Sequence, residues 1–139
     1  MDGITKQTVE RIRVNAIYEG LLANFRAFHA YARENETGIS LTFCLMRQNW
    51  HELGQFCAFA DEWDCPVFVN TVKRPPECSL FTMSAADLKQ IVGAMEKEAV
   101  SLLPKLKMNA AVWLGELERL RSIVRSNPST GPLNILRSA

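Results

Sequence analysis

Two apolar runs of this sequence, residues 39–46 and 66–72, each end in polar side chains of the kinds that bind ligands. A helix-like stretch separates them, so strand, helix, strand is the simplest interpretation, and strands joined in this way run parallel. Proteins built from such units bind their ligands at the carboxyl ends of the strands. The residues in this position are Arg47, Gln48, Asn49, Asn70 and Thr71.

The segment after the first run has the pattern of a helix start. In the sequence NWHE, Asn49 is followed three residues later by Glu52, which is the spacing of a capping box. The Asn49 side chain would accept a hydrogen bond from the Glu52 N–H, and the Glu52 carboxylate would reach back. A helix is therefore predicted from Asn49 to about Trp63, and capping and ligand contact both remain open roles for Asn49.

Apolar spacing predicts four further helices, over residues 8–13, 17–34, 84–99 and 109–126. The third begins with Ser84 and has Asp87 three residues later, a pattern typical of a capped helix start. We expect the second helix to point one apolar face to the core. That face consists of Ile17, Leu21, Phe25, Phe28 and Ala32.

The two predicted strands contain few polar residues, so we expect both of their faces to be covered. A parallel sheet of two strands cannot satisfy its own edges. Either a strand is hidden elsewhere, for example in residues 80–83 or in the tail, or another chain supplies one. The fold class predicted is helix-rich α/β, built from β/α units with parallel strands.

Composition limits the kinds of partner. With 139 residues and a net charge of +1, the chain is expected to form one domain over residues 1–126, followed by a flexible tail at 127–139. A charge this small does not attract nucleic acid or anionic membranes. The sequence contains no signal peptide and no long apolar run, so a cytoplasmic location is expected.

The sequence predicts neither a metal site nor a catalytic residue. Its cysteines lack the Cys-x-x-Cys spacing of metal and redox sites, and we expect buried thiols at Cys44, Cys57, Cys65 and Cys78. Neither His29 nor His51 has a Ser, Cys or Asp at a spacing that would indicate a nucleophile and its base. The acidic group Asp61, Glu62 and Asp64 is interpreted as a solvated helix end.

Three segments carry a resemblance to a known family. They are residues 2–13 (DGITKQTVERIR), 45–53 (LMRQNWHEL) and 69–72 (VNTV), in this order and spacing. Together with the intervening helix they resemble the second half of the partial (β/α) barrel of radical S-adenosylmethionine enzymes, particularly those related to the SPASM-bearing subfamily. The resemblance covers roughly the first two thirds of the chain.

The resemblance implies a set of cofactor-binding residues. Asp2 and Gly3 would border the ribose of S-adenosylmethionine, and Arg13 would approach its carboxylate. Arg47, Asn49, Asn70 and Thr71 would line the face formed by the strand ends. The family's Cys-x3-Cys-x2-Cys motif and the SPASM cysteines are absent, so no iron-sulfur cluster is expected on this chain, and it is not expected to be active alone.

Two functions follow as expectations. In the first, the chain is the carboxyl half of a radical S-adenosylmethionine barrel, and the cluster-bearing half is either encoded upstream of it or carried by a separate chain. In the second, it is a non-catalytic interaction module whose exposed strand edges, at residues 39–46 or 66–72, pair with a second copy to form a homodimer.

Overall fold

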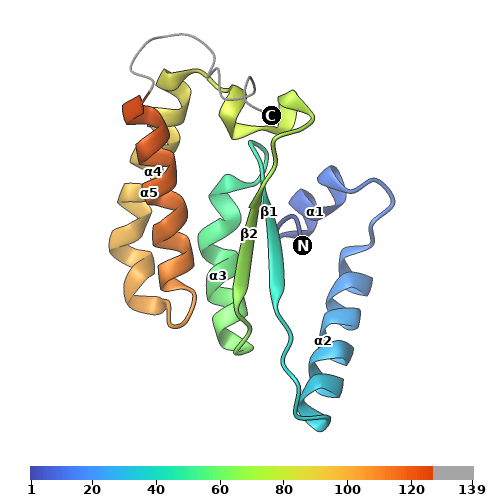
Figure 1. Ribbon diagram of the computed structural model, residues 1–139. Helices are drawn as coiled ribbons and strands as arrows, with labels where there is room; N and C mark the ends of the chain where they lie inside the picture. Colours follow the sequence, from blue (N-terminus) through green and yellow to red (C-terminus); the bar gives the residue numbers. More distant parts are fainter. Residues whose placement is uncertain (127–139) are drawn as a thin grey trace.

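One parallel pair of strands lies at the centre of the computed structural model, which describes residues 1–126 (Figure 1). Strand β1 (Leu41–Leu45) pairs with β2 (Val67–Thr71), and α3 (Leu53–Glu62) connects the two. The α/β class, the parallel pairing and the high helix content predicted from the sequence are confirmed. The other helices are α1 (Lys6–Ile12), α2 (Tyr18–Glu34), α4 (Ala85–Leu102) and α5 (Ala110–Ser126).

Of the two alternatives for completing the sheet, a hidden strand is not found in the described part of the chain. Residues 80–83 contain a 3-10 turn, Leu80–Thr82, in which the Phe81 N–H donates to the Ser79 hydroxyl. The second suggested location, the tail at 127–139, lies outside the described residues. None of the described helices combines the length and the apolarity that a bilayer crossing needs.

Only one face of the sheet is covered, so the prediction that both faces are buried is wrong. Phe43, Leu45 and Val67 are buried on the face that packs against α3 and α5. On the opposite face Phe68 is 60% exposed and Thr42, its partner in register, is also exposed. Period-two alternation explains the difference, since Thr42 and Phe68 point away from the side on which these helices lie.

The apolar face predicted for α2 is also only partly buried. Phe25 packs against α3, with its ring centroid 5.2 Å from that of Trp63 and 5.4 Å from that of Phe59. Ile17 and Phe28 are 70% and 67% exposed. Among residues 1–126, nothing covers this side of α2, which therefore leaves large apolar side chains in solvent.

Helices α4 and α5 form an antiparallel pair beyond α3 (Figure 1). The predicted cap of α4 is confirmed, because the Ser84 hydroxyl accepts a hydrogen bond of 3.1 Å from the Asp87 N–H. On α5 the side chains of Trp113, Leu117 and Leu120 are buried, at the spacing that the sequence predicts. This pair closes the core on the covered face of the sheet.

Asp61 is buried, which contradicts its interpretation as part of a solvated helix end. Its carboxylate accepts hydrogen bonds from the backbone N–H of Lys107 at 2.6 Å and from both the backbone and the side chain of Asn109, at 3.1 and 2.8 Å. The Asn109 side chain in turn accepts from the Val67 N–H at 2.8 Å. This buried cluster joins the end of α3, the start of β2 and the start of α5.

Two glycines in helices provide a matched test of the packing. A Cβ built on Gly54 in α3 would lie 2.5 Å from Glu98 Oε1 and 2.7 Å from Leu102 Cδ2, whereas one on Gly115 in α5 would meet nothing within 4 Å. We predict that Gly54→Ala lowers the free energy of unfolding by about 1 kcal/mol or more, and that Gly115→Ala raises it by about 0.5–1 kcal/mol. Urea denaturation measures both, and equal effects would contradict the close approach of α3 and α4.

Candidate functional site

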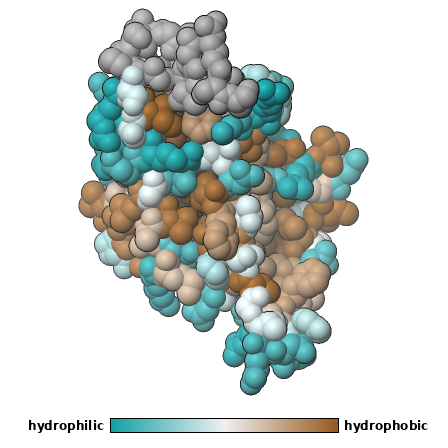
Figure 2. Space-filling model, viewed as in Figure 1, coloured by the Kyte–Doolittle hydropathy of each residue, from teal (hydrophilic) through white to brown (hydrophobic). Residues whose placement is uncertain are grey.

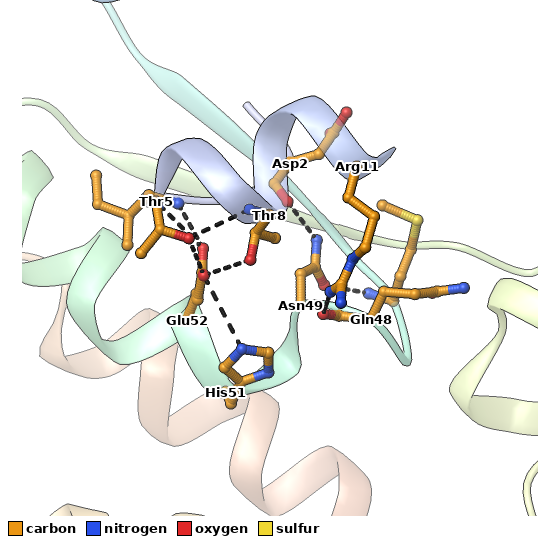
Figure 3. Close-up of polar contacts among 10 residues, drawn as sticks. Asp2, Thr5, Thr8, Arg11, Gln48, Asn49, His51 and Glu52 are labelled. Atoms are coloured by element: carbon orange, nitrogen blue, oxygen red, sulfur yellow. Dashed lines mark hydrogen bonds and ion pairs between the residues drawn. The ribbon is translucent and has the colours of Figure 1, made fainter. Parts of the chain in front are cut away.

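The candidate site lies at the carboxyl end of the sheet, where the amino-terminal segment meets the end of β1 (Figure 3). At its base is Glu52, whose carboxylate is buried. It accepts hydrogen bonds from the Ile4 N–H at 2.7 Å and from the hydroxyls of Thr5 and Thr8 at 2.6 and 2.5 Å. A single carboxylate thus fixes the start of α1 against the start of α3.

The predicted capping box is wrong. Asn49 makes no side-chain cap, residues Trp50–Glu52 form a 3-10 turn, and α3 begins at Leu53. The Glu52 carboxylate is directed to α1 instead of back to the N–H of Asn49. The threonine hydroxyls and the main-chain amide at the start of α1 offer more donors than the single N–H of a cap. The Glu52 carboxylate therefore bonds to α1 and not to the Asn49 N–H.

Asn49 is fully buried and joins two backbone segments, the amino-terminal segment and the end of β1. Its Oδ1 accepts from the Met46 N–H at 2.7 Å, and its Nδ2 donates to the carbonyls of Asp2 and Cys44 at 2.9 and 2.8 Å. Both polar atoms of the Asn49 side chain are thus hydrogen-bonded to backbone groups within the protein. Asn49 therefore positions the amino-terminal segment, and in this structure it has no free polar atom toward the strand-end face.

Asp2 and Arg13, two residues expected at the cofactor, pair with each other. The Asp2 carboxylate is buried, and its second oxygen, Oδ1, has no hydrogen-bond partner in the described part of the chain. The side chain of Arg13 is 61% exposed. The exposed guanidinium of Arg13 is the member of this pair that could bind a carboxylate.

Gly3 and Cys44 lie next to the pair of Asp2 and Arg13. A Cβ on Gly3 would lie 2.7 Å from both Glu52 Oε2 and Thr8 Cγ2, so the close approach of this segment to Glu52 requires glycine. Cys44 is half-buried, and burial, followed by the nearby Asp2 carboxylate, raises the pKa of its thiol. The thiol is therefore protonated at neutral pH and is no nucleophile.

Arg47 binds the loop that follows β2. Its guanidinium donates to the Ser79 carbonyl and to the Thr82 hydroxyl, both at 2.8 Å. Beside it, the Gln48 side chain donates to the Cys78 sulfur at 3.5 Å. The side chains of Arg47 and Gln48 are thus both bonded to the loop that follows β2.

Asn70 and Thr71 are placed differently from each other. Asn70 is exposed on the open face of the sheet, opposite Cys44 in register. The Thr71 hydroxyl accepts a hydrogen bond from Arg119 of α5, which also pairs with Glu116. The sequence analysis does not identify Arg119, because no local signal in the predicted helix at 109–126 marks this residue.

The structure thus brings Asp2, Gly3, Arg13 and Asn49 together at one end of β1, whereas Arg47 and Thr71 are bonded to other parts of the chain. Within residues 1–126, no three His, Cys, Asp or Glu side chains gather in a way that would hold a metal ion. The arrangement can bind and orient a ligand with hydroxyl and carboxylate groups.

Comparison with known proteins gave no match to the chain among family models, curated proteins or solved structures. The geometry of the site and the resemblance of the three sequence segments therefore carry the assignment of function.

The Glu52 cluster generates a pH prediction. Burial alone would raise the pKa of Glu52, but the hydrogen bonds from Thr5, Thr8 and Ile4 outweigh it and lower the pKa from its ordinary value of 4.5. A lowered pKa in the folded state contributes stability that is present above pH 4.5 and is lost as the pH falls further through the folded pKa.

We predict that Glu52→Gln lowers the free energy of unfolding by about 2 kcal/mol at neutral pH, since an amide cannot accept all of these hydrogen bonds. The difference between the two proteins should narrow below pH 4.5, where the carboxylate of the unfolded wild type becomes protonated. Urea titrations at pH 7 and at several acidic pH values measure this. A difference that stays constant with pH would contradict the role given to the charged carboxylate.

Proposed function

We propose that this chain is the carboxyl half of a radical S-adenosylmethionine enzyme barrel. It contributes strand ends that face the cofactor and the substrate, and a partner half contributes the iron-sulfur cluster. When bound, cofactor and cluster together supply the radical chemistry. The residues of this chain bind and orient the cofactor and shape the space around it.

The observation that carries this proposal is the one-sided covering of a parallel β/α/β unit. In a (β/α) barrel the helices lie outside and the other face of each strand points to the interior. Here α3 and α5 pack on the face of Phe43 and Val67, while Phe68 and Asn70 on the other face remain exposed. An exposed face with mixed polar and apolar side chains is what an incomplete barrel would present.

The end of β1 supports the choice of cofactor. The unpartnered Oδ1 of Asp2 is an acceptor suited to the hydroxyls of a ribose. The exposed guanidinium of Arg13 is suited to an amino-acid carboxylate. S-adenosylmethionine carries both groups. Gly3, which admits no side chain, lets the segment that carries Asp2 lie close to Glu52 and Thr8.

An NMR titration of the chain with S-adenosylmethionine tests the proposal. We expect shifts of the backbone amides of Gly3, Cys44 and Asn70 at millimolar ligand. Arg13→Gln should weaken binding about tenfold, which is the loss of one charged hydrogen-bonded pair. Arg26→Gln, an exposed arginine of α2 outside the site, is the matched control and should bind as the wild type does. The absence of shifts in this region with the wild type would contradict the proposed function.

A second candidate function has its own support. Phe28, Tyr31 and Phe68 are each at least 60% exposed, and both sheet edges are free of a further strand among the described residues. A non-catalytic module that forms a homodimer through its strand edges would hide these groups. It predicts a dimer in sedimentation equilibrium at micromolar concentration, unchanged by S-adenosylmethionine. A monomer would contradict it.

A further inference from the structure

A polar cleft lies at the end of the sheet opposite the candidate site, where both strands begin. Figure 1 shows that α2 and α3 both end here, and Figure 2 shows hydrophilic residues gathered where α2 ends. The cleft has a volume of about 300 Å³, at the lower end of the range for small-molecule sites. Its walls come from three segments, which are the last turns of α2, residues 37–39 before β1 and residues 63–65 after α3.

One wall of the cleft, formed by His29 and Trp63, is held in a single geometry. His29 Nε2 lies 2.9 Å from the Trp63 carbonyl oxygen, and the two rings meet edge to face with their centroids 5.0 Å apart. Because a carbonyl can only accept, the His29 Nε2–H is the donor. Trp63 also packs edge to face on the buried Phe25, at 5.2 Å. This wall is therefore already in place before a ligand binds, which reduces the cost of binding.

Charged side chains of both signs line the cleft. Arg33 of α2 and Asp64 after α3 both contribute to it. A neighbouring hollow of about 380 Å³ shares these two residues and adds Glu62. Within residues 1–126, none of the three side chains takes part in an ion pair. The carboxylates disfavour a simple anion and the guanidinium disfavours a simple cation, whereas a ligand that carries both charges complements the cleft.

The carboxylate of Asp64 stands at a position that favours neither the residue nor its charge. The backbone φ of Asp64 is 51°, in the left-handed region, directly after a helix end where glycine is the usual residue. The end of a helix also disfavours negative charge. A glycine at this position would therefore suit the fold at least as well as the aspartate does.

We propose that this cleft binds a free α-amino acid. The ligand carboxylate bonds to Arg33, whose planar guanidinium matches the geometry of a carboxylate. The ligand ammonium group lies at the carboxylates of Asp64 and Glu62, and the ligand side chain packs against Trp63. The cleft and the candidate site are at opposite ends of the sheet, so this inference goes beyond the proposed function and does not depend on it.

An NMR titration with L-leucine tests the inference, since its aliphatic side chain suits the indole of Trp63. We expect shifts of the Trp63 indole N–H and of the backbone amides of Thr37, Gly38 and Asp64 at millimolar ligand. Two analogues of the same shape test the charges. 3-Methylbutylamine lacks the carboxylate and 4-methylpentanoate lacks the amino group. Each should bind about fivefold more weakly than L-leucine, which is the loss of one partly exposed ion pair.

Variants assign each charge of the ligand to its partner. Arg33→Gln should weaken L-leucine binding about fivefold, yet it should not weaken binding of 3-methylbutylamine, which has no carboxylate to lose. Arg26→Gln, an exposed arginine of the same helix outside the cleft, is the matched control and should bind L-leucine as the wild type does.

Asp64→Gly separates binding from folding. It should weaken L-leucine binding about fivefold. In urea denaturation it should not lower the stability of the chain, because it relieves the left-handed backbone and removes a negative charge from a helix end. A loss of binding without a loss of stability is a result that a purely structural role of Asp64 would not produce.

Three outcomes would overturn the inference. They are the absence of shifts in the cleft with L-leucine, equal binding of L-leucine and both analogues, and equal effects of Arg33→Gln and Arg26→Gln. S-adenosylmethionine also carries an α-amino acid group. If it shifts the cleft residues and leaves Gly3, Cys44 and Asn70 unchanged, the cleft is supported and the proposed cofactor site is contradicted, so the two proposals fail separately.

Discussion

The buried carboxylate of Glu52 is the constraint on which the amino-terminal half of the molecule depends. It lies at the junction of the 3-10 turn and α3, and its partners Ile4, Thr5 and Thr8 are more than forty positions away along the chain. A buried carboxylate is costly unless it is fully bonded, so this cluster selects one position of α1. The placement of Asp2, Gly3 and Arg13 beside β1 follows from it.

Side-chain amides take the place of absent strands at two ends of the sheet. At the end of β1, Asn49 accepts from Met46 and donates to Cys44, as a neighbouring peptide group would. At the start of β2, Asn109 accepts from Val67 and donates to Cys65 in the same way. A sheet this small leaves many backbone groups without a strand partner, and these two residues satisfy several of them. Among residues 1–126, the edge beside residues 39–41 has no such substitute.

Local signals predicted the helices and strands well, because apolar spacing and the Ser84 cap depend only on neighbouring residues. Local signals failed where residues distant in the sequence compete for the same side chain. Asn49 and Glu52 have the spacing of a capping box, yet the amino-terminal segment engages both side chains. The Ile4 N–H donates to Glu52, and the Asp2 carbonyl accepts from Asn49. Apolarity predicted burial of Phe28 and Phe68, although burial requires a covering element, and none lies over them in residues 1–126. The bond from Arg119 to Thr71 spans a separation that no sequence pattern encodes.

The cluster of Asp61 and Asn109 has a consequence for local opening. The amide protons of Val67, Lys107 and Asn109 all end on these two side chains, at distances of 2.8, 2.6 and 3.1 Å. Separation of the start of α5 from the end of α3 would break all three of these hydrogen bonds. The three protons belong to different elements, yet we expect one opening event to release them together, which would couple the first strand residue of β2 to the start of α5.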